Sequence, residues 1–273
     1  VNAGPGFLER MNMAFKAGWT SVIVLAAGAF MLQGCGGLPP GSNEAAEEAA
    51  ENVLTPAPDL PKPWVSAINL SEKTDLLDFE YIIPPDAAAR KVVREWMTRQ
   101  ADRLKALALK SARDDFKASQ EGGYEYRQHS DGSRWAAAAD TRSLMSFQGQ
   151  HFFYTGGAHP MTNYMALVYD KREGQLLKPL DIFSDPAAAV AAITPLYCKR
   201  LDELRLEKRG EKTDPSDLFG DCPKLREATF LPVSTIPKMI DRLRNILDPY
   251  VAGPYAEGEY VIELPVDQQL IDL

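Results

Sequence analysis

The segment D-F-E-Y-I-I-P-P-D, residues 78–86, predicts a strand that stops abruptly before a helix. Phe79, Tyr81 and Ile83 alternate along it, as expected for a strand with one buried face. The two prolines that follow end the strand, and Asp86 is then well placed to be the N-cap of a helix. The segment therefore indicates that strands and helices alternate in this part of the chain.

A long helical pattern extends from Asp86 to about residue 118, and Gly122-Gly123 ends it. Apolar and small side chains recur along one face of this helix, which is the face expected to meet a sheet. The residues of that face are Ala89, Val93, Trp96, Met97, Gln100, Leu104, Leu107 and Ser111.

Further strands are expected on both sides of a second helix. This helix opens with Asp185-Pro186, a cap followed by a first-turn proline, and runs towards Lys208 with Pro195 at a potential kink. The apolar residues of 240–247 fit a helical spacing, although a strand before the Asp248-Pro249 break also fits. Strands are predicted at residues 124–127, 135–140, 144–154, 162–170, 228–233 and 258–264, joined by polar turns such as 129–132.

This pattern predicts an α+β fold: antiparallel sheets, each with one main helix, in two packed halves. We expect the halves to comprise residues 64–165 and 166–273.

Residues 1–34 have the layout of a secretory signal peptide. A weakly basic start precedes an apolar run at residues 22–32, which is too short to span a bilayer as a stable helix. The small residue before Cys35 resembles a bacterial lipobox, which implies cleavage before Cys35 and acylation of that cysteine. An ordinary signal peptide with a cysteine there by chance is the alternative.

Residues 36–63 are rich in proline and glutamate and bury little apolar surface, so we expect a disordered tether after Cys35. The chain carries a net charge of −8, of which −5 falls on residues 64–273. This acidic balance excludes nucleic acid as a partner, because affinity for nucleic acid rests on neutralising phosphates. A basic partner is favoured, although the charge also fits an ordinary soluble surface.

Two cysteines remain besides Cys35, namely Cys198 and Cys222. An exported protein is in an oxidising compartment, where such a pair usually forms a disulfide. A metal site is the rival interpretation, but two cysteines with no histidine nearby make a poor zinc site.

Motifs for catalysis, cofactors or metals are missing from the sequence, and we predict no catalytic residue, cofactor or metal ligand. There is no G-x-S-x-G motif, and Ser133 is expected to lie in a turn. His129, His151 and His159 are the chain's three histidines, and no carboxylate at helical spacing completes a metal set with them. Carboxylate pairs that could act on sugars stay open, because 38 acidic residues always supply candidates.

The stretch Y-T-G-G-A-H-P, residues 154–160, is the strongest candidate for a binding site. His159 is either a binding residue at a loop tip or a residue that bonds a backbone carbonyl to fix the turn. Tyr250 and Tyr255 lie in a Gly/Pro-rich loop, where tyrosines form a binding rim or pack locally. The predicted ligand-binding residues are Tyr154, His159, Tyr250 and Tyr255.

Five features follow one another in order: residues 154–160, the following strand with Tyr169-Asp170, L-x-x-L-D-I-F at 177–183, the cysteine-bearing helix, and D-P-Y-V-A-G-P-Y-A-E-G at 248–258. Together they resemble the extracytoplasmic two-domain module of RsiV-type anti-sigma factors and PdaC-type peptidoglycan deacetylases. The resemblance implies a non-catalytic module of the cell wall, and it makes residues 240–247 a strand. Its anti-sigma members bind lysozyme, and its deacetylase members carry their chemistry in a separate metal-dependent domain that we do not expect here.

We therefore predict a lipid-anchored, periplasmic binding module for a lysozyme-like protein or for peptidoglycan. The membrane is reached through the lipid on Cys35, and the outer membrane is favoured in a Gram-negative cell. A cell-wall-acting enzyme with His159 in its site, and a purely structural lipoprotein, remain the alternatives.

Overall fold

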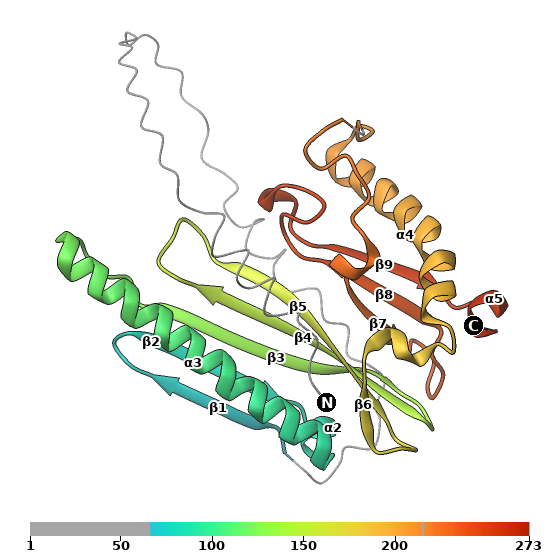
Figure 1. Ribbon diagram of the computed structural model, residues 1–273, viewed down its shortest axis with the longest axis horizontal. Helices are drawn as coiled ribbons and strands as arrows, with labels where there is room; N and C mark the ends of the chain where they lie inside the picture. Colours follow the sequence, from blue (N-terminus) through green and yellow to red (C-terminus); the bar gives the residue numbers. More distant parts are fainter. Residues whose placement is uncertain (1–65, 215, 273) are drawn as a thin grey trace, which may run out of the picture. The chain divides into compact units, whose positions relative to one another are not determined.

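The computed structural model describes residues 66–214 and 216–272. The expected signal segment, Cys35 and the tether to residue 63 lie outside the described residues. The described chain forms two β-sheets, each covered by one long helix, so the predicted α+β class is confirmed (Figure 1).

The first sheet contains six strands, β1 (Ile68–Lys73), β2 (Leu77–Ile83), β3 (His129–Asp140), β4 (Leu144–Tyr154), β5 (Met161–Asp170) and β6 (Gln175–Leu177), and they lie in sequence order. Neighbouring strands are antiparallel except β2 and β3, which are parallel. The expectation of antiparallel sheets fails for this pair, because the helix α3 (Lys91–Gly122) carries the chain back along the sheet between the two strands.

The strand and helix predicted from residues 78–86 are present. In β2, Leu77, Phe79, Tyr81 and Ile83 are buried against α3, as the alternation predicted. The helix starts later than expected, because Pro85 begins a separate short helix, α2 (Pro85–Ala88), and Asp86 falls inside its first turn rather than at a cap.

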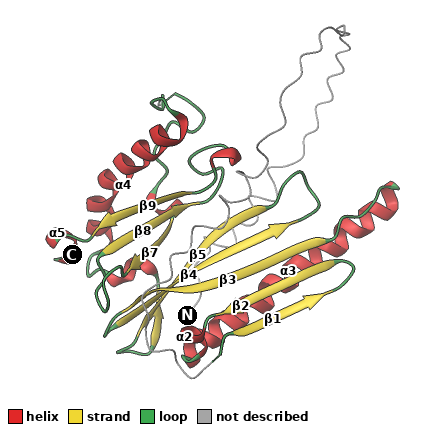
Figure 2. Cartoon of the chain, turned by 180° about the vertical axis from the view of Figure 1, so that it is seen from behind, coloured by secondary structure: helices red, strands yellow, loops and turns green. Residues whose placement is uncertain are grey.

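The helix α3 lies along one face of the first sheet (Figure 2), and its predicted inner face is largely buried there. Val93, Met97, Gln100 and Leu104 are buried, whereas Leu107 is exposed. The helix ends where a glycine pair was expected to end it, since Gly123 takes the left-handed conformation with φ of 67°. The core beneath the helix also contains Trp135, Met145, Phe147, Met165 and Leu167.

The expected turn at residues 129–132 and the expected strand at 124–127 are both wrong. Residues 129–132 belong to β3, and residues 124–128 precede it without regular structure. The sequence predicted only the second part of this strand, residues 135–140, because the inward residues of its first part are polar: His129, Asp131 and Ser133 are all buried. With no apolar residue at these positions, the period-two hydrophobic signal is absent.

The second sheet contains three antiparallel strands, β7 (Thr229–Val233), β8 (Arg242–Leu247) and β9 (Tyr260–Pro265). The helix α4 (Pro186–Arg209) lies on one face of this sheet (Figure 1). Its N-cap is Asp185, as predicted, and Asp185 Oδ1 accepts bonds from the amides of Ala187 and Ala188 at 3.0 Å. Short elements complete this half: η2 (Pro179–Ile182), η3 (Leu225–Glu227), η4 (Tyr255–Glu257) and α5 (Gln268–Ile271).

The ambiguous residues 240–247 form the strand that the family resemblance implied, β8. Both of its faces carry buried apolar side chains. Leu243 and Leu247 join the core beneath α4, while Ile246 joins a cluster with Leu231 and Val233 on the opposite face. Apolar residues on both faces of a strand blur the period-two pattern, which explains the helical spacing.

The two sheets meet through β7 and the far face of β3 to β5. Ala138, Tyr164 and Ala166 pack against the Leu231 cluster. Ser146 Oγ donates to the carbonyl of Pro232 at 2.5 Å, which joins the two sheets by a buried hydrogen bond. The first sheet extends to Leu177, so the expected boundary between residues 165 and 166 falls inside β5.

Candidate functional site

The tip of the β4–β5 hairpin, residues 155–160, holds His159 in a fixed orientation. Gly156 has a φ of 80°, in the left-handed region that favours glycine. His159 Nδ1 lies 3.0 Å from the carbonyl oxygen of Pro160. Because a carbonyl only accepts, Nδ1 carries a proton, and in a neutral imidazole Nε2 is then an acceptor.

His159, Tyr250 and Tyr255 come together and are called the aromatic cluster below. The ring of His159 stacks on that of Tyr255, with centroids 3.8 Å apart and an interplanar angle of 22°. The Tyr250 hydroxyl lies 3.2 Å from His159 Nε2, to which it can donate, and its ring centroid is 5.8 Å from that of Tyr255. The structure therefore joins the hairpin tip to the loop between β8 and β9.

Tyr154, the fourth predicted binding residue, holds the hairpin tip. Its hydroxyl donates to the carbonyl of Gly157 at 3.1 Å. This bond joins the end of β4 to the turn that precedes His159, so Tyr154 helps to hold the position of His159.

Tyr250 has an unusual backbone. Its φ is 71°, a left-handed conformation that is a genuine outlier for a bulky side chain. Its side chain is nevertheless 48% exposed, so burial of the ring does not compensate for the strain. Strain of this kind, of order 1–3 kcal/mol, persists where the surrounding structure enforces it and is concentrated at functional sites.

A shallow hollow of about 380 Å³ opens beside Tyr255. Its remaining lining comes from Thr162 at the start of β5 and from Pro249, Ala256, Glu257, Gly258 and Glu259 in the loop before β9. The hollow thus combines an aromatic ring, a hydroxyl and two carboxylates, which can stack on a ligand and accept hydrogen bonds from it.

The two carboxylates of the hollow differ in their environment. Glu257 is bound by Arg209, whose Nε and Nη2 donate to its two oxygens at 2.9 and 3.0 Å, and the hydroxyl of Tyr260 also donates to it. Burial alone would raise the pKa of Glu257, but these hydrogen bonds hold its pKa below the ordinary value. Glu257 is therefore a structural anchor.

Glu259 borders Tyr164, a half-buried tyrosine at the start of β5. Burial and then the charge of Glu259 raise the pKa of the Tyr164 phenol, so Tyr164 stays protonated at neutral pH. The amide of Tyr164 donates to Asp248 Oδ1 at 2.9 Å, and this bond ties β5 to the end of β8. Sequence reasoning missed Tyr164 and Glu259, because neither residue is part of a recognised motif.

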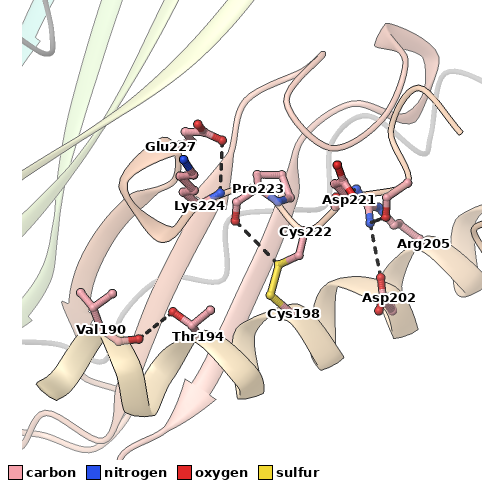
Figure 3. Close-up of a disulfide and its surroundings, with 11 residues drawn as sticks. Val190, Thr194, Cys198, Asp202, Arg205, Asp221, Cys222, Pro223, Lys224 and Glu227 are labelled. Atoms are coloured by element: carbon pink, nitrogen blue, oxygen red, sulfur yellow. Dashed lines mark hydrogen bonds and ion pairs between the residues drawn. A yellow bond between two sulfur atoms is a disulfide. The ribbon is translucent and has the colours of Figure 1, made fainter. Parts of the chain in front are cut away.

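The predicted pairing of Cys198 and Cys222 is present in the structure (Figure 3). The disulfide joins α4 to the segment that precedes η3, with the two Cα atoms 5.6 Å apart. The metal-site alternative for these cysteines is therefore set aside.

A second group of chemically active residues lies under α3 and is called the polar strip: His129, Asp131, Ser133 and His151. His151 Nε2 lies 3.0 Å from Asp131 Oδ2, and Ser133 is the cross-strand partner of His151. Although this set has the residue types of a hydrolytic triad, Ser133 Oγ has no hydrogen-bond partner within the described residues. Ser133 is also fully buried in β3, not in the turn expected for it, so a substrate cannot reach it.

Within residues 66–214 and 216–272, no group of three histidine, cysteine or acidic side chains could hold a metal ion. None of the helices in that same part of the chain is both long and apolar enough to cross a membrane.

One segment of the chain is similar to a known protein family. Residues 70–162, from β1 to the start of β5, match the family described as Deacetylase PdaC. The segment is thus similar to the PdaC type, which was one part of the predicted resemblance. Among curated proteins, none matches the chain.

The chain is also similar to two solved structures that are described as members of the DUF3298 family. One, from Bacteroides fragilis, is 16% identical, with a TM-score of 0.49 over 75% of this chain and 91% of that chain. The other, from Pseudomonas aeruginosa, is 13% identical, with a TM-score of 0.43 over 77% of this chain and 94% of that chain.

Proposed function

We propose that this chain is a binding module of the bacterial cell envelope, and that the aromatic cluster and the adjoining hollow bind the glycan of peptidoglycan. The observation that carries the proposal is Tyr250, an exposed tyrosine in a strained left-handed backbone, held against His159. A chain that maintains such strain at a surface side chain has a use for that side chain.

The chemistry of the site suits a sugar polymer. The rings of Tyr250 and Tyr255 offer apolar faces, and the carboxylate of Glu259 with the hydroxyl of Thr162 offers polar partners. A hollow of about 380 Å³ is large enough for one or two sugar rings. Its open, shallow form fits a long polymer that passes across it.

A basic, lysozyme-like protein is the second candidate, favoured by the net charge of −5 on residues 64–273. Opposite charge accelerates association and favours a basic partner, and exposed tyrosines are common in protein interfaces. Catalysis is a weaker proposal, because the serine, histidine and aspartate of the polar strip are buried under α3.

We further propose that residues 1–34 are a signal peptide and that Cys35 carries the lipid of a periplasmic lipoprotein, in the outer membrane if the cell is Gram-negative. The order of basic start, apolar run and Leu-Gln-Gly-Cys at residues 32–35 supports this proposal. Anchorage near the wall would bring the hollow to its ligand.

Binding to purified peptidoglycan sacculi tests the proposed ligand. The full chain should sediment with sacculi, and Tyr255→Ala should weaken the binding about tenfold, since buried aromatic contacts of this kind contribute at least 1.4 kcal/mol. Tyr124→Ala is the matched control, because Tyr124 is 57% exposed and lies outside the cluster.

Two other outcomes decide between the candidates. Capture of lysozyme but not of sacculi, with the same loss on Tyr255→Ala, would establish the protein-binding candidate in place of the glycan. Release of soluble muropeptides, lost on His159→Ala, would establish an enzyme.

Membrane fractionation tests the anchor. The wild-type chain should partition with membranes, and Cys35→Ser should move it to the soluble fraction. Unchanged membrane association of Cys35→Ser would refute lipid attachment at this residue.

A further inference from the structure

We propose that Arg205, acting with the Cys198–Cys222 disulfide, positions the loop that carries Tyr250 and Tyr255. The inference rests on the proposed function, because it concerns the same aromatic cluster. Residues 248–259 are called the aromatic loop below, and residues 216–222 the cysteine segment.

Arg205 is a buried cation whose acceptors are mainly backbone carbonyls. Its side chain has 0% exposure. Nε donates to the carbonyl of Ala252 at 3.1 Å, Nη1 to that of Gly220 at 3.2 Å, and Nη2 to that of Asp221 at 3.0 Å. The carboxylate of Asp202, 3.3 Å from Nη1, is itself 64% exposed (Figure 3).

These acceptors belong to two different segments. Ala252 lies in the aromatic loop, two residues after Tyr250 and three before Tyr255, whereas Gly220 and Asp221 lie in the cysteine segment. A guanidinium donates from a rigid plane, so its bonds fix the two segments in one geometry. Arg205 therefore connects the cysteine segment to the aromatic loop.

The disulfide attaches the cysteine segment to α4 beside Arg205. Cys222 directly follows Asp221, and Cys198 lies seven residues before Arg205, on the same side of α4. The helix thus holds the cysteine segment at two points, by the disulfide and by Arg205 (Figure 3). Without the disulfide, two of the carbonyl acceptors of Arg205 would no longer be held beside it.

Arg209 supports the same loop one turn further along α4. Its Nη2 donates to the carbonyl of Ala252 at 3.2 Å, in addition to its bonds with Glu257. The carbonyl of Ala252 therefore accepts from two arginines. Together they set where the loop meets the helix, and so where Tyr250 meets His159.

A purely stabilising role would weaken the whole fold without changing the cluster in particular. The three histidines of the chain can distinguish a general stabilising role from a positioning role, because they lie in different parts of the fold. His159 belongs to the aromatic cluster, whereas His129 and His151 lie in the first sheet, away from α4. Their imidazole signals in NMR spectra report on the cluster and on the rest of the fold at once, with no ligand present.

The experiment compares Arg205→Lys and Cys198→Ala/Cys222→Ala in the full chain with the wild type. Arg200→Lys is the matched control, because Arg200 lies on the same helix but bonds only to the exposed side chains of Glu203 and Glu207. We expect the His159 signal to shift towards its position in Tyr250→Phe, where the hydroxyl is lost. The signals of His129 and His151, and all three signals in Arg200→Lys, should stay unchanged.

A His159 signal that is unchanged in both test variants would overturn the proposal, and so would equal shifts of all three signals in a folded variant. If Arg205→Lys does not fold, the double cysteine variant decides alone. The NMR readout needs no ligand, so it is independent of the sacculus assay. A wild-type chain that does not bind sacculi would refute the proposed glycan binding and leave the positioning role of Arg205 intact. Sacculus binding should fall at least threefold in both test variants if both proposals hold.

Discussion

The two long helices differ in the partners of some of their basic residues. On α3, Lys91, Lys110 and Lys117 pair with acidic residues four positions along the same helix, and all are exposed. On α4, Arg205 and Arg209 instead reach into the fold and bind the loops around the second sheet.

The difference follows from the size of the two sheets. The first helix covers part of a six-stranded sheet with a large apolar core, so exposed ion pairs add little to it. The second helix covers only three strands, and long loops surround it. A small core is hard to stabilise by apolar burial alone, and here a disulfide and buried arginine bonds supplement it.

The largest effect should come from Arg205→Met, which keeps much of the side-chain volume but removes its donors. Three backbone carbonyls would lose a buried donor, and we expect a loss of about 4 kcal/mol in the free energy of unfolding. Urea unfolding followed by circular dichroism measures it. Arg200→Met is the control at about 0.5 kcal/mol or less, and equal losses in the two variants would remove the contrast between buried and surface cations.

Removal of the disulfide should be the next largest effect. The bond closes a loop between residues 24 apart, so Cys198→Ala/Cys222→Ala should lose about 3 kcal/mol through the entropy of the unfolded chain. Amide hydrogen exchange should accelerate first in β7 to β9 and later in β2 to β5. Uniform acceleration in both sheets would mean that the second half does not depend specially on the bond.

Acid should lower the free energy of unfolding through His129, which lies in the first sheet. The loss should be smaller than that from Arg205→Met or from removal of the disulfide. Burial lowers the pKa of His129 from 6.5, although Asp115, 3.1 Å away, opposes this. Since the unfolded chain then takes up a proton at higher pH than the folded chain, stability falls as the pH drops through 6.5 towards the folded pKa. Urea unfolding at pH 7.5 and 5.5 measures the loss, which should shrink in His129→Gln. An equal loss in that variant would assign the effect to other groups.

The smallest effect should come from the surface pairs of α3. Lys110→Ala and Lys117→Ala each remove an exposed pair, and each should change the free energy of unfolding by about 0.5 kcal/mol or less. Thermal unfolding at low and high salt checks this. A loss above 1 kcal/mol would show that the helix depends on its surface charges after all.

The sequence predicted those elements whose apolar residues follow a clean period. The β4 strand and the inner face of α3 were expected from such patterns, whereas the start of α4 was expected from the cap and first-turn proline of Asp185-Pro186. The cluster residues His159, Tyr250 and Tyr255 were identified from glycine- and proline-rich loops, where exposed aromatic residues are unusual. Their mutual contact was not predicted, because no local pattern encodes a contact between two loops.

The failures have physical causes as well. The first part of β3, residues 129–134, was missed because its buried histidine, aspartate and serine give no hydrophobic signal. The parallel pairing of β2 and β3 depends on how α3 crosses the sheet, which its own residues do not specify. Arg205 carries no local sequence signal of burial, since its acceptors are carbonyls 15 to 47 residues away.

The contact between His159 and Tyr250 also bears on the order of folding. The two residues are 91 positions apart, and neither sheet contains both of them. Loop closure over such a distance costs entropy that only well-formed structure can offset, so local pairings such as the β4–β5 hairpin should form earlier. The aromatic cluster is therefore expected to assemble last, when both sheets have docked, and a chain that is still folding would have no working site.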